Sequence, residues 1–454
     1  MSVKLDWQIE AERVYQRVGE DPRERRRRWR TRLRIIMFTL LVFAIAGGLV
    51  GLVALRLSTV DSQIRQALID TARAEVTALR IGDFGAFIAI QRSASDNWIR
   101  AQNERFNRYQ QLKVEADLQL TGVVVDAVVD GQRGRVILEE RVEGIPYHTV
   151  WFYWRYSDGW RHVPSDYTFW GDPGTIDGQA TTVQYRGVDT RLAGALAPRL
   201  DRWWAEGCAI LGCEPELRMT AHIVPNPGLV MHWDGTRPNT LIIPAPLAAD
   251  ERARADADLP LPLEGEIARY VAERLVDLAN GGLQPAANVD SAWLRQNIIE
   301  WLTARFTGRG DVFRLGFVQS LYDGYGPEAL AATVRALPTE IDLGAVARAV
   351  GQPIETLALD WRAFFQWRLD VEKTLLARND QAGIAALWDL SDPAAQAAMR
   401  QRMSVPLQAT AQVQSVEIVA GPDGMPRAVV PVIIEGNPAV VQFRLVDGVW
   451  RRSS

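Results

Sequence analysis

Residues 265–269 read Gly-Glu-Ile-Ala-Arg and have the spacing of a zinc-binding motif. Two histidines four residues apart share one face of a helix and can hold a zinc ion, while the glutamate after the first histidine acts as general base. Here Glu266 occupies the glutamate position, but Gly265 and Arg269 stand where the histidines would be. Glycine offers no side-chain ligand and arginine is a permanent cation, so the spacing predicts a zinc-site geometry without its ligands.

Later segments resemble the bacterial peptidase-MA-like proteins, which belong to the gluzincin peptidases. Residues 293–302 read Trp-Leu-Arg-Gln-Asn-Ile-Ile-Glu-Trp-Leu, similar to the family pattern Trp-Leu-Arg-Glu-Gly-x-Ala-Glu-Trp-Leu. The first glutamate of that pattern is the family's third zinc ligand, and Gln296 stands at its place. Residues 317–328 resemble the family's late helix and Tyr-Gly turn, and residues 357–365 resemble its closing helix. The resemblance implies a gluzincin-like α+β domain over residues 173–369.

All three positions that match the family's ligands are changed in this protein, which implies a degenerate site with no catalytic residue, metal or cofactor. A neutral amide is a poor zinc ligand beside carboxylate or imidazole, and without a metal-bound water Glu266 has nothing to activate. Glu266 is then either a solvated helix carboxylate or the ion-pair partner of Arg269 or Arg295. The expected vestigial cleft consists of Gly265, Glu266, Arg269, Gln296 and Glu300.

Patterns in the middle of the sequence predict a small sheet followed by helices, the order of a gluzincin-type domain. Short β-rich runs at residues 182–185, 219–225 and 240–244 predict strands, and residues 192–204 predict a helix with a kink at Pro198. From residue 263 onward the pattern is helical nearly throughout. His222 and His232 lie on or near one of these strands, and with a carboxylate they are an alternative metal site that no spacing motif supports.

Two cysteines are present, Cys208 and Cys213, and they lie five residues apart. An even number of cysteines outside the cytoplasm permits a disulfide that closes a short loop, and two buried free thiols are the alternative. No other Cys or His lies nearby in the sequence to complete four zinc ligands.

Two stretches far apart in the sequence resemble each other and indicate a repeat. The first begins at residues 79–87 and the second at residues 376–384, and each contains an early aspartate, Asp83 or Asp380. Each is preceded by a helical pattern and followed by β-rich runs. Each closes on an Asp-Gly hairpin with a Trp-Arg pair, at residues 152–161 and 443–451.

This order resembles the nuclear-transport-factor-2-like, cystatin-type fold, in which a curved antiparallel sheet forms a cone. The resemblance covers residues 62–172 and 370–454. Enzymes of that superfamily place acid or base residues inside the cone, but no histidine–aspartate pair is evident here. His148 and His162 lie in or beside the last strands of the first copy, where a lone histidine is usually a surface or hydrogen-bonded residue.

Residues 35–55 contain no charged side groups, and a helix of that length spans roughly 30 Å, the thickness of the bilayer hydrocarbon core. Eight arginines precede it within residues 23–34, and residues 1–34 hold 11 Lys and Arg against 6 Asp and Glu. The positive-inside rule then predicts a basic cytoplasmic tail at 1–34, a transmembrane helix at 35–57 and extracytoplasmic domains after it. The bilayer is the expected partner of residues 35–55.

Bulk composition limits the remaining function classes. The protein has 454 residues, 48% hydrophobic and 23% charged, and is long enough for two to four domains with full cores. The net charge is -4, and no long stretch predicts a nucleic-acid surface. The sequence therefore predicts an α+β multidomain membrane protein of the cell envelope. Without catalysis, it binds a peptide or an envelope protein or serves as a scaffold. The alternative is a membrane-anchored metallopeptidase-like hydrolase with an unorthodox site.

Overall fold

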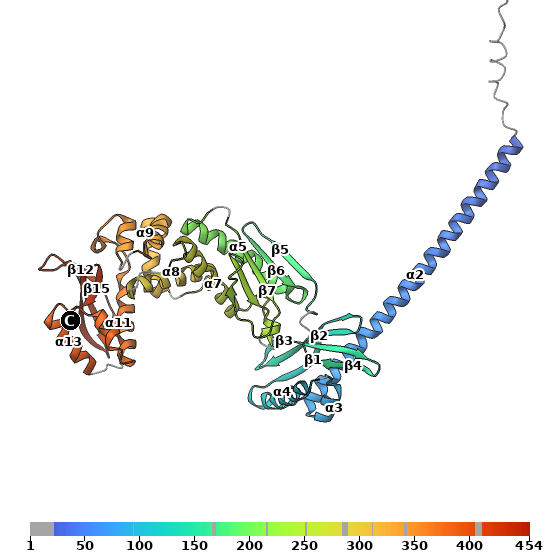
Figure 1. The fold of residues 1–454 in the computed structure, drawn as a ribbon, viewed down its shortest axis with the longest axis horizontal. Helices are drawn as coiled ribbons and strands as arrows, with labels where there is room; N and C mark the ends of the chain where they lie inside the picture. The colour runs from blue at the N-terminus through green and yellow to red at the C-terminus, as the bar shows by residue number, and fades with distance from the viewer. Residues whose placement is uncertain are drawn as a thin grey trace, which may run out of the picture. The chain divides into compact units, whose positions relative to one another are not determined.

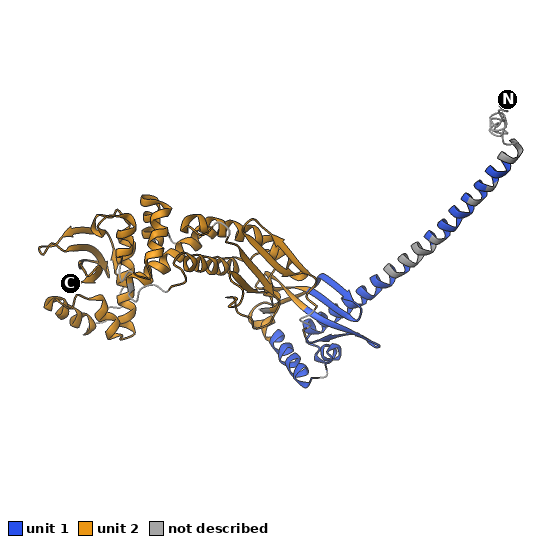
Figure 2. Ribbon diagram, turned by 45° about the horizontal axis from the view of Figure 1, so that its top comes forward, with its two compact units in different colours: residues 1–110, 122–137, 151–164 blue, residues 111–121, 138–150, 165–454 orange. Residues whose placement is uncertain are grey.

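The computed structural model mixes helices with three β-sheets, which confirms the α+β class (Figure 1). It describes residues 22–93, 95–165, 169–214, 217–249, 252–283, 289–310, 312–339, 343–404 and 411–454. Two compact units divide the protein (Figure 2). Unit 1 comprises residues 1–110, 122–137 and 151–164, and unit 2 comprises residues 111–121, 138–150 and 165–454. The expected segments 173–369 and 370–454 thus both belong to unit 2.

The first described element is the 60-residue helix α2 (Pro22–Ile81), which contains the expected transmembrane segment. Among the described residues, no helix has both the length and the hydropathy that a membrane crossing requires. Residues 1–21, most of the predicted tail, lie outside the described residues, as do the side groups of 46, 49–55 and 57–58 within α2. The transmembrane helix and its topology therefore stay predictions.

In unit 1 the end of α2 is followed by α3 (Phe84–Ile90) and α4 (Asp96–Glu115). Gly82 has a φ of 76°, which reverses the backbone direction after α2, and the carboxylate of Asp83 accepts a 2.9 Å hydrogen bond from Ala86 N to cap α3. Phe87 of α3 packs against Phe106 of α4 with ring centroids 5.4 Å apart. These contacts hold both short helices beside the end of α2.

The sheet that follows has the order β1-β2-β3-β10, with β4 also paired to β3. Its strands are β1 (Gln119–Asp130), β2 (Arg133–Val142), β3 (Ile145–Tyr156), β4 (Gly159–Val163) and the short β10 (Ala253–Arg254). The predicted hairpin at residues 152–161 is formed by β3 and β4, which pair Tyr153 with His162 and Tyr156 with Gly159.

A second sheet and a group of helices form the middle of the protein. The sheet has the order β5-β6-β7-β9-β8, with β6, β7 and β9 parallel. Its strands are β5 (Pro173–Asp177), β6 (Thr181–Arg186), β7 (Met219–Val224), β8 (His232–Trp233) and β9 (Thr240–Pro244). Around them run η1 (Gly187–Asp189), α5 (Thr190–Leu211), α6 (Pro246–Ala249), α7 (Leu261–Ala279), α8 (Val289–Thr307), α9 (Val312–Ala336), α10 (Gly344–Val350) and η2 (Ile354–Thr356).

These elements confirm the secondary structure expected for the middle segment. The three predicted strands are β6, β7 and β9, and the predicted helix is α5, which continues through Pro198. The expected Tyr-Gly turn is a break inside α9, where Gly326 has a φ of 81° and Pro327 follows it. Trp203 and Trp204 of α5 are fully buried in the core, beside Leu275 of α7.

The C-terminal part repeats the plan of unit 1. Helix α11 (Trp361–Ala377) is followed by α12 (Gln381–Leu387), α13 (Pro393–Ser404) and a sheet of order β11-β13-β14-β15, with β12 paired to β13. Its strands are β11 (Gln412–Val413), β12 (Glu417–Ala420), β13 (Pro426–Ile434), β14 (Asn437–Val446) and β15 (Val449–Arg452). The predicted Asp-Gly hairpin joins β14 to β15, with both loop residues at positive φ.

The two copies agree in local detail as well as in order. Asp380 caps α12 through Gly383 N at 2.9 Å, as Asp83 caps α3. After each capped helix one residue forms a parallel bridge to the last strand, Gln91 to His162 and Trp388 to Arg452. The repeat seen in the sequence is therefore also a repeat of backbone pairing.

Candidate functional site

The zinc-motif residues lie in the first half of α7, mostly on its solvent side. Glu266 and Arg269 are exposed, and Gly265 is half-buried. Arg269 Nε lies 3.4 Å from Glu273 Oε1, one turn further along the same helix. A Cβ added at Gly265 would meet no atom within 4 Å, so a larger residue has room there.

The third ligand position, Gln296, lies on α8 and is half-buried, as is Glu300. Gln296 Nε2 donates a 3.1 Å hydrogen bond to Glu300 Oε1 within the same helix. Arg295 Nη2 lies 2.6 Å from Asp277 Oδ1 on α7. Of the two alternatives for Glu266, the solvated helix carboxylate is the one that fits, because Glu266 is exposed and Arg269 and Arg295 each contact a different carboxylate.

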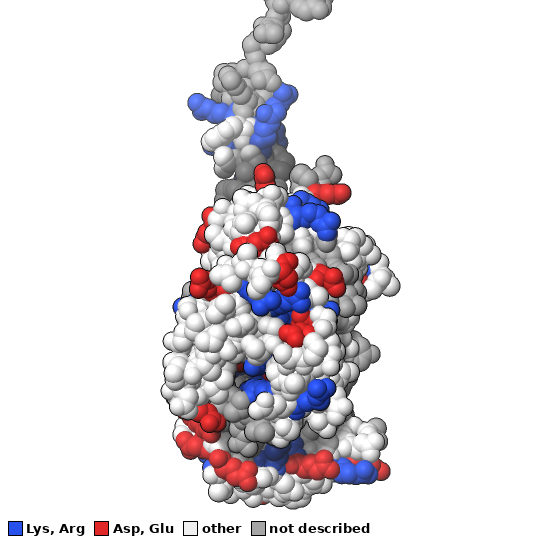
Figure 3. Space-filling view, turned by 90° about the vertical axis from the view of Figure 1, so that its left-hand side faces the viewer, with Lys and Arg blue, Asp and Glu red and all other residues white. Residues whose placement is uncertain are grey.

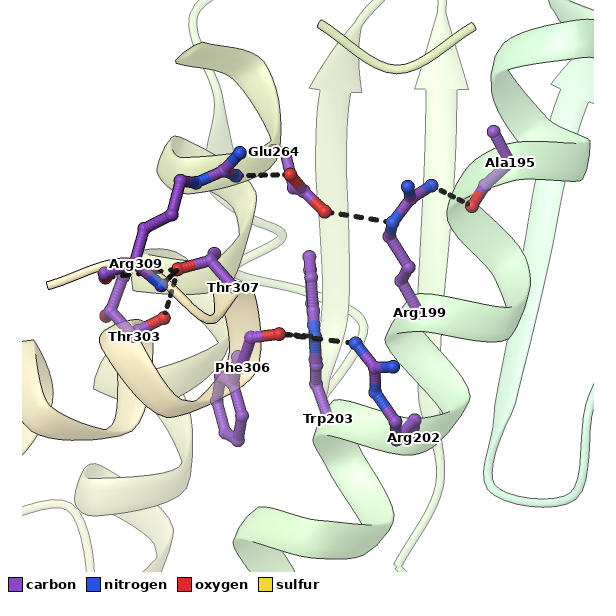
Figure 4. A network of polar contacts seen from close by, with 9 residues as sticks. All are labelled: Ala195, Arg199, Arg202, Trp203, Glu264, Thr303, Phe306, Thr307 and Arg309. Carbon is purple, nitrogen blue, oxygen red and sulfur yellow. Dashed lines mark hydrogen bonds and ion pairs between the residues drawn. The ribbon is translucent and has the colours of Figure 1, made fainter. Parts of the chain in front are cut away.

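The buried carboxylate of this helix is Glu264, one residue before the motif, which the sequence analysis did not single out. Glu264 has 7% of its surface exposed. Its Oε1 lies 2.9 Å from Arg199 Nε of α5, and its Oε2 accepts a hydrogen bond from Arg309 Nη2, as Figure 4 shows. Glu264 lies on the face that carries the buried residues Ile267, Ala268, Val271 and Leu275. That apolar periodicity is the sequence signal that could have found it.

Among the described residues no group of three His, Cys, Asp or Glu side groups is close enough to hold a metal ion. His222 and His232 pair with opposite sides of Ile242, so one strand separates them. Burial, together with Arg237 and Arg186, lowers the pKa of His222. His232 Nδ1 lies 2.7 Å from Val230 O, so the ring contacts the backbone of the loop that precedes β8.

Cys208 and Cys213 are two free, half-buried thiols at the end of α5. Gly212, with a φ of 72°, ends the helix in the left-handed conformation and brings Cys213 N to 3.1 Å from Cys208 O. The thiols interact, and the hydrogen bond between them raises the pKa of Cys208 and lowers that of Cys213. The free-thiol alternative is the one present, although the backbone reversal keeps the sulfurs close.

His162 is the hydrogen-bonded kind of strand-end histidine, and it belongs to a buried acid–base cluster in unit 1. Glu75 of α2 and His162 of β4 are 0% and 2% exposed. His162 Nδ1 lies 2.7 Å from Glu75 Oε1, and Gln91 Nε2 donates to the same oxygen at 2.8 Å. Tyr153 of β3 donates its hydroxyl to Glu75 Oε2 at 2.9 Å. One carboxylate therefore accepts hydrogen bonds from three buried side chains.

The protonation of this cluster follows from burial and charge. Burial alone would raise the pKa of Glu75, but the charge and hydrogen bond of His162, with Arg105 and Tyr153, lower it. Burial lowers the pKa of His162, and Glu75 offsets this only in part. At neutral pH the cluster is therefore an ionised Glu75 beside a neutral imidazole that donates from Nδ1. Burial and the Glu75 charge raise the pKa of Tyr153 well above its usual value.

The second copy places an arginine at the position that matches His162. Glu372 of α11 is 3% exposed, and Arg452 Nη1 of β15 donates to its two oxygens at 2.9 and 2.8 Å. Arg402 Nε of α13 also approaches Glu372 Oε1 at 3.4 Å. Arg452 pairs with Phe443 in the hairpin, just as His162 pairs with Tyr153. Both glutamates precede their capping aspartate by eight residues, which is the sequence signal that could have found them.

Surface charge gives no sign of a large single-sign region on the face drawn in Figure 3, where acidic and basic residues are interspersed. No protein-family model, curated protein or solved structure matches the sequence. Function is therefore argued from the residues and their geometry.

Proposed function

We propose that this is a membrane-anchored protein whose extracytoplasmic part binds a peptide or an envelope protein without catalysis. The observation that carries this proposal is the state of the three ligand positions. Gly265 has no ligand atom, Arg269 contacts Glu273, and Gln296 donates to Glu300. Each polar group is thus satisfied within its own helix, and Arg269 adds a permanent positive charge that repels a zinc ion.

The membrane part of the proposal draws support from the surface of α2. Large apolar residues at eight positions are exposed: Ile36, Met37, Phe38, Leu40, Leu41, Val42, Phe43 and Ile45. Successive residues of a helix are rotated by 100°, so these side chains cover every side of the helix. Lipid around this stretch keeps all of these apolar side chains out of water. Exposed arginines precede this stretch, which favours a cytoplasmic N-terminus.

A decisive experiment for this function is metal and activity analysis of the full-length protein in detergent. We expect no stoichiometric zinc and no hydrolysis of a mixed-sequence peptide substrate. The triple variant Gly265→His, Arg269→His, Gln296→Glu should gain zinc, since position 265 has room for a larger residue. Zinc bound by the unmodified protein and lost in Glu266→Ala would overturn the proposal.

A second candidate function, a hydrolase with its site in the first cone-type domain, is favoured by the acid–base cluster of unit 1. The rings of Trp98 and Trp151 lie 5.5 and 5.4 Å from the ring of His162, and their Nε1 atoms are buried without a hydrogen-bond partner among the described residues. Buried polar atoms normally have partners, so a water or a substrate group is expected there. Turnover that is lost in His162→Gln but kept in Arg452→Gln would support this candidate over the first.

A further inference from the structure

A cavity of about 290 Å³ lies in unit 2 at the end of α8. Six of its lining residues matter here: Trp301, Ala304, Arg305, Arg309, Leu315 and Gln319. Pockets that enclose a drug-sized ligand usually have about 300–1,000 Å³, so this one has room for a single residue or the end of a peptide. Its walls combine apolar surface with two guanidinium groups.

The turn after α8 fixes one of those guanidinium groups. Gly308 has a φ of 69°, and Arg309 N donates to Ala304 O at 3.1 Å as the helix ends. A Cβ at Gly310 would lie 2.4 Å from the Cβ of Ala304, so the turn can lie against α8 only because this residue is glycine. Arg309 is thereby held at the cavity from a tightly folded turn.

The second guanidinium group is oriented by aromatic rings and an ion pair. Arg305 lies over the rings of Trp301 and Tyr322, at 5.5 and 5.1 Å from their centroids. Its Nε contacts Glu206 Oε1 at 2.6 Å. Trp301 Nε1 is already bonded to Gln319 Oε1 at 2.7 Å, so the indole contributes its apolar surface to the cavity wall. Stacking of this kind pre-organises the planar fork for a carboxylate.

Positive charge is in excess around this cavity. Arg309 shares Glu264 with Arg199, and Arg202 donates to a backbone oxygen, Phe306 O, at 3.2 Å (Figure 4). Arg305 contacts Glu206. Gln319 of the cavity wall also donates to Asp323 at 2.9 Å, so within the described residues of this network four guanidinium groups stand against three carboxylates. A guanidinium group has five N–H donors, and the hydrogen bonds to Glu206 and Glu264 use one from each lining arginine.

We propose that this cavity binds a carboxylate carried on a short apolar segment of a peptide or protein, an inference that rests on the binding function proposed above. The carboxylate takes the forks of Arg305 and Arg309, and the apolar segment lies against Trp301 and Leu315. Either the C-terminus of a polypeptide or an acidic residue within it supplies this chemistry. A cavity of about 290 Å³ lies just below the range that encloses a drug-sized ligand, so it favours one residue or one end of a longer polypeptide.

The test is fluorescence anisotropy on the full-length protein in detergent with three labelled peptides. Ala-Ala-Leu-Phe with a free C-terminus, its C-terminal amide, and Ala-Ala-Leu-Glu amide separate the two carboxylate sources. We expect one or both carboxylate peptides to bind and the first amide not to bind. Arg305→Gln and Arg309→Gln should each weaken binding at least about tenfold, the loss expected for a charge-assisted hydrogen bond.

Two further variants keep the result interpretable. Arg305→Lys preserves the charge beside Glu206 and hence the fold, but it loses the planar fork and should still bind more weakly. Arg254→Gln is the matched control, because Arg254 contacts Asp256 and does not line the cavity. Binding that is unchanged in the Arg305 and Arg309 variants, or equally weakened in the control, would overturn the site while leaving a binding function intact. No binding of either carboxylate peptide would also overturn it, whereas stoichiometric zinc would overturn the proposed function instead.

Discussion

The two copies of the helix-and-sheet repeat use a buried glutamate at the same place but give it different partners. In the first copy Glu75 holds His162 and Tyr153, and in the second Glu372 holds Arg452, with Phe443 where the tyrosine was. In each copy the carboxylate comes from the helix before the capped helix, α2 or α11, and its hydrogen-bond donor comes from the last strand, β4 or β15. The pair therefore ties the same two elements together in both copies.

The two copies differ in whether the partner of the buried glutamate can change its protonation state with pH. The second copy has an arginine in place of the imidazole, and a guanidinium group does not change its charge between neutral and mildly acid pH. His162 can gain a proton in the range that cells and compartments reach, and burial opposes that gain. The first copy is thus expected to respond to acid and the second is not.

The largest expected effect is loss of either glutamate. Glu75→Ala leaves three buried donors without their acceptor, and Glu372→Ala leaves the half-buried Arg452 without its carboxylate. Breaking a buried pair from one side costs about 3–5 kcal/mol. Hydrogen exchange at neutral pH should show faster opening of residues 145–163 in the first variant and of 437–452 in the second. A loss below about 1 kcal/mol in either case would contradict the role given to these carboxylates.

A smaller effect is expected from acid on the unmodified protein. Since the folded pKa of His162 lies below its ordinary value of 6.5, the unfolded state takes up a proton that the folded protein excludes. The free energy of unfolding of unit 1 should therefore fall as pH drops below about 6.5, by about 1.4 kcal/mol per pKa unit of displacement. Glu75 acts in the same direction below its ordinary value of 4.5, because its folded pKa is also lowered.

Hydrogen exchange between pH 7.5 and 5.5, corrected for the intrinsic exchange rate, measures this acid response. Peptides from residues 437–452 in the same sample are the internal control and should show no such change. Equal acid sensitivity of the two hairpins would contradict the comparison.

Exchanging the partners should exchange the behaviour. His162→Arg combined with Tyr153→Phe gives the first copy the residues of the second and should remove its acid sensitivity. Arg452→His should introduce acid sensitivity into the second copy, where Arg402 still faces Glu372. If the exchanged proteins keep their original pH profiles, the partner of the glutamate is not what sets the response.

The smallest expected effect concerns the phenol alone. Tyr153→Phe removes one hydrogen bond to an ionised carboxylate, worth about 1.5 kcal/mol, and leaves two in place. Thermal unfolding of unit 1 should shift slightly, and the fall below pH 6.5 should persist. Phe443→Tyr, which adds a hydroxyl at the matching position of the second copy, is the matched control.

The sequence indicated local structure more reliably than long-range contacts. Capping aspartates and Asp-Gly turns act within a few residues, so the repeat and its hairpins were predicted correctly. The contact between Glu75 and His162 joins residues 87 positions apart. It depends on the register of β4 against β3 and on the distance between β4 and α2. No local sequence pattern contains that information. A related signal is that Glu75 and Glu372 occupy matching positions in the two copies of the repeat.

The zinc motif shows the opposite difficulty, because the spacing of a motif does not show which side of its helix is buried. Glu266 fits the motif but points to solvent, whereas Glu264 lies in line with Ile267 and Val271 and is buried. The motif spacing indicated Glu266, whereas the buried face of the helix carries Glu264.

The most direct test of the comparison is a histidine NMR titration. The protein has 4 histidines, so ¹⁵N-histidine labelling of the full-length protein gives few signals, and His162→Gln assigns the one that matters. We predict a neutral imidazole protonated at Nδ1 at pH 7, with a midpoint below 6.5. A His162 signal that shows an imidazolium at pH 7, with a midpoint above 6.5, would contradict the account.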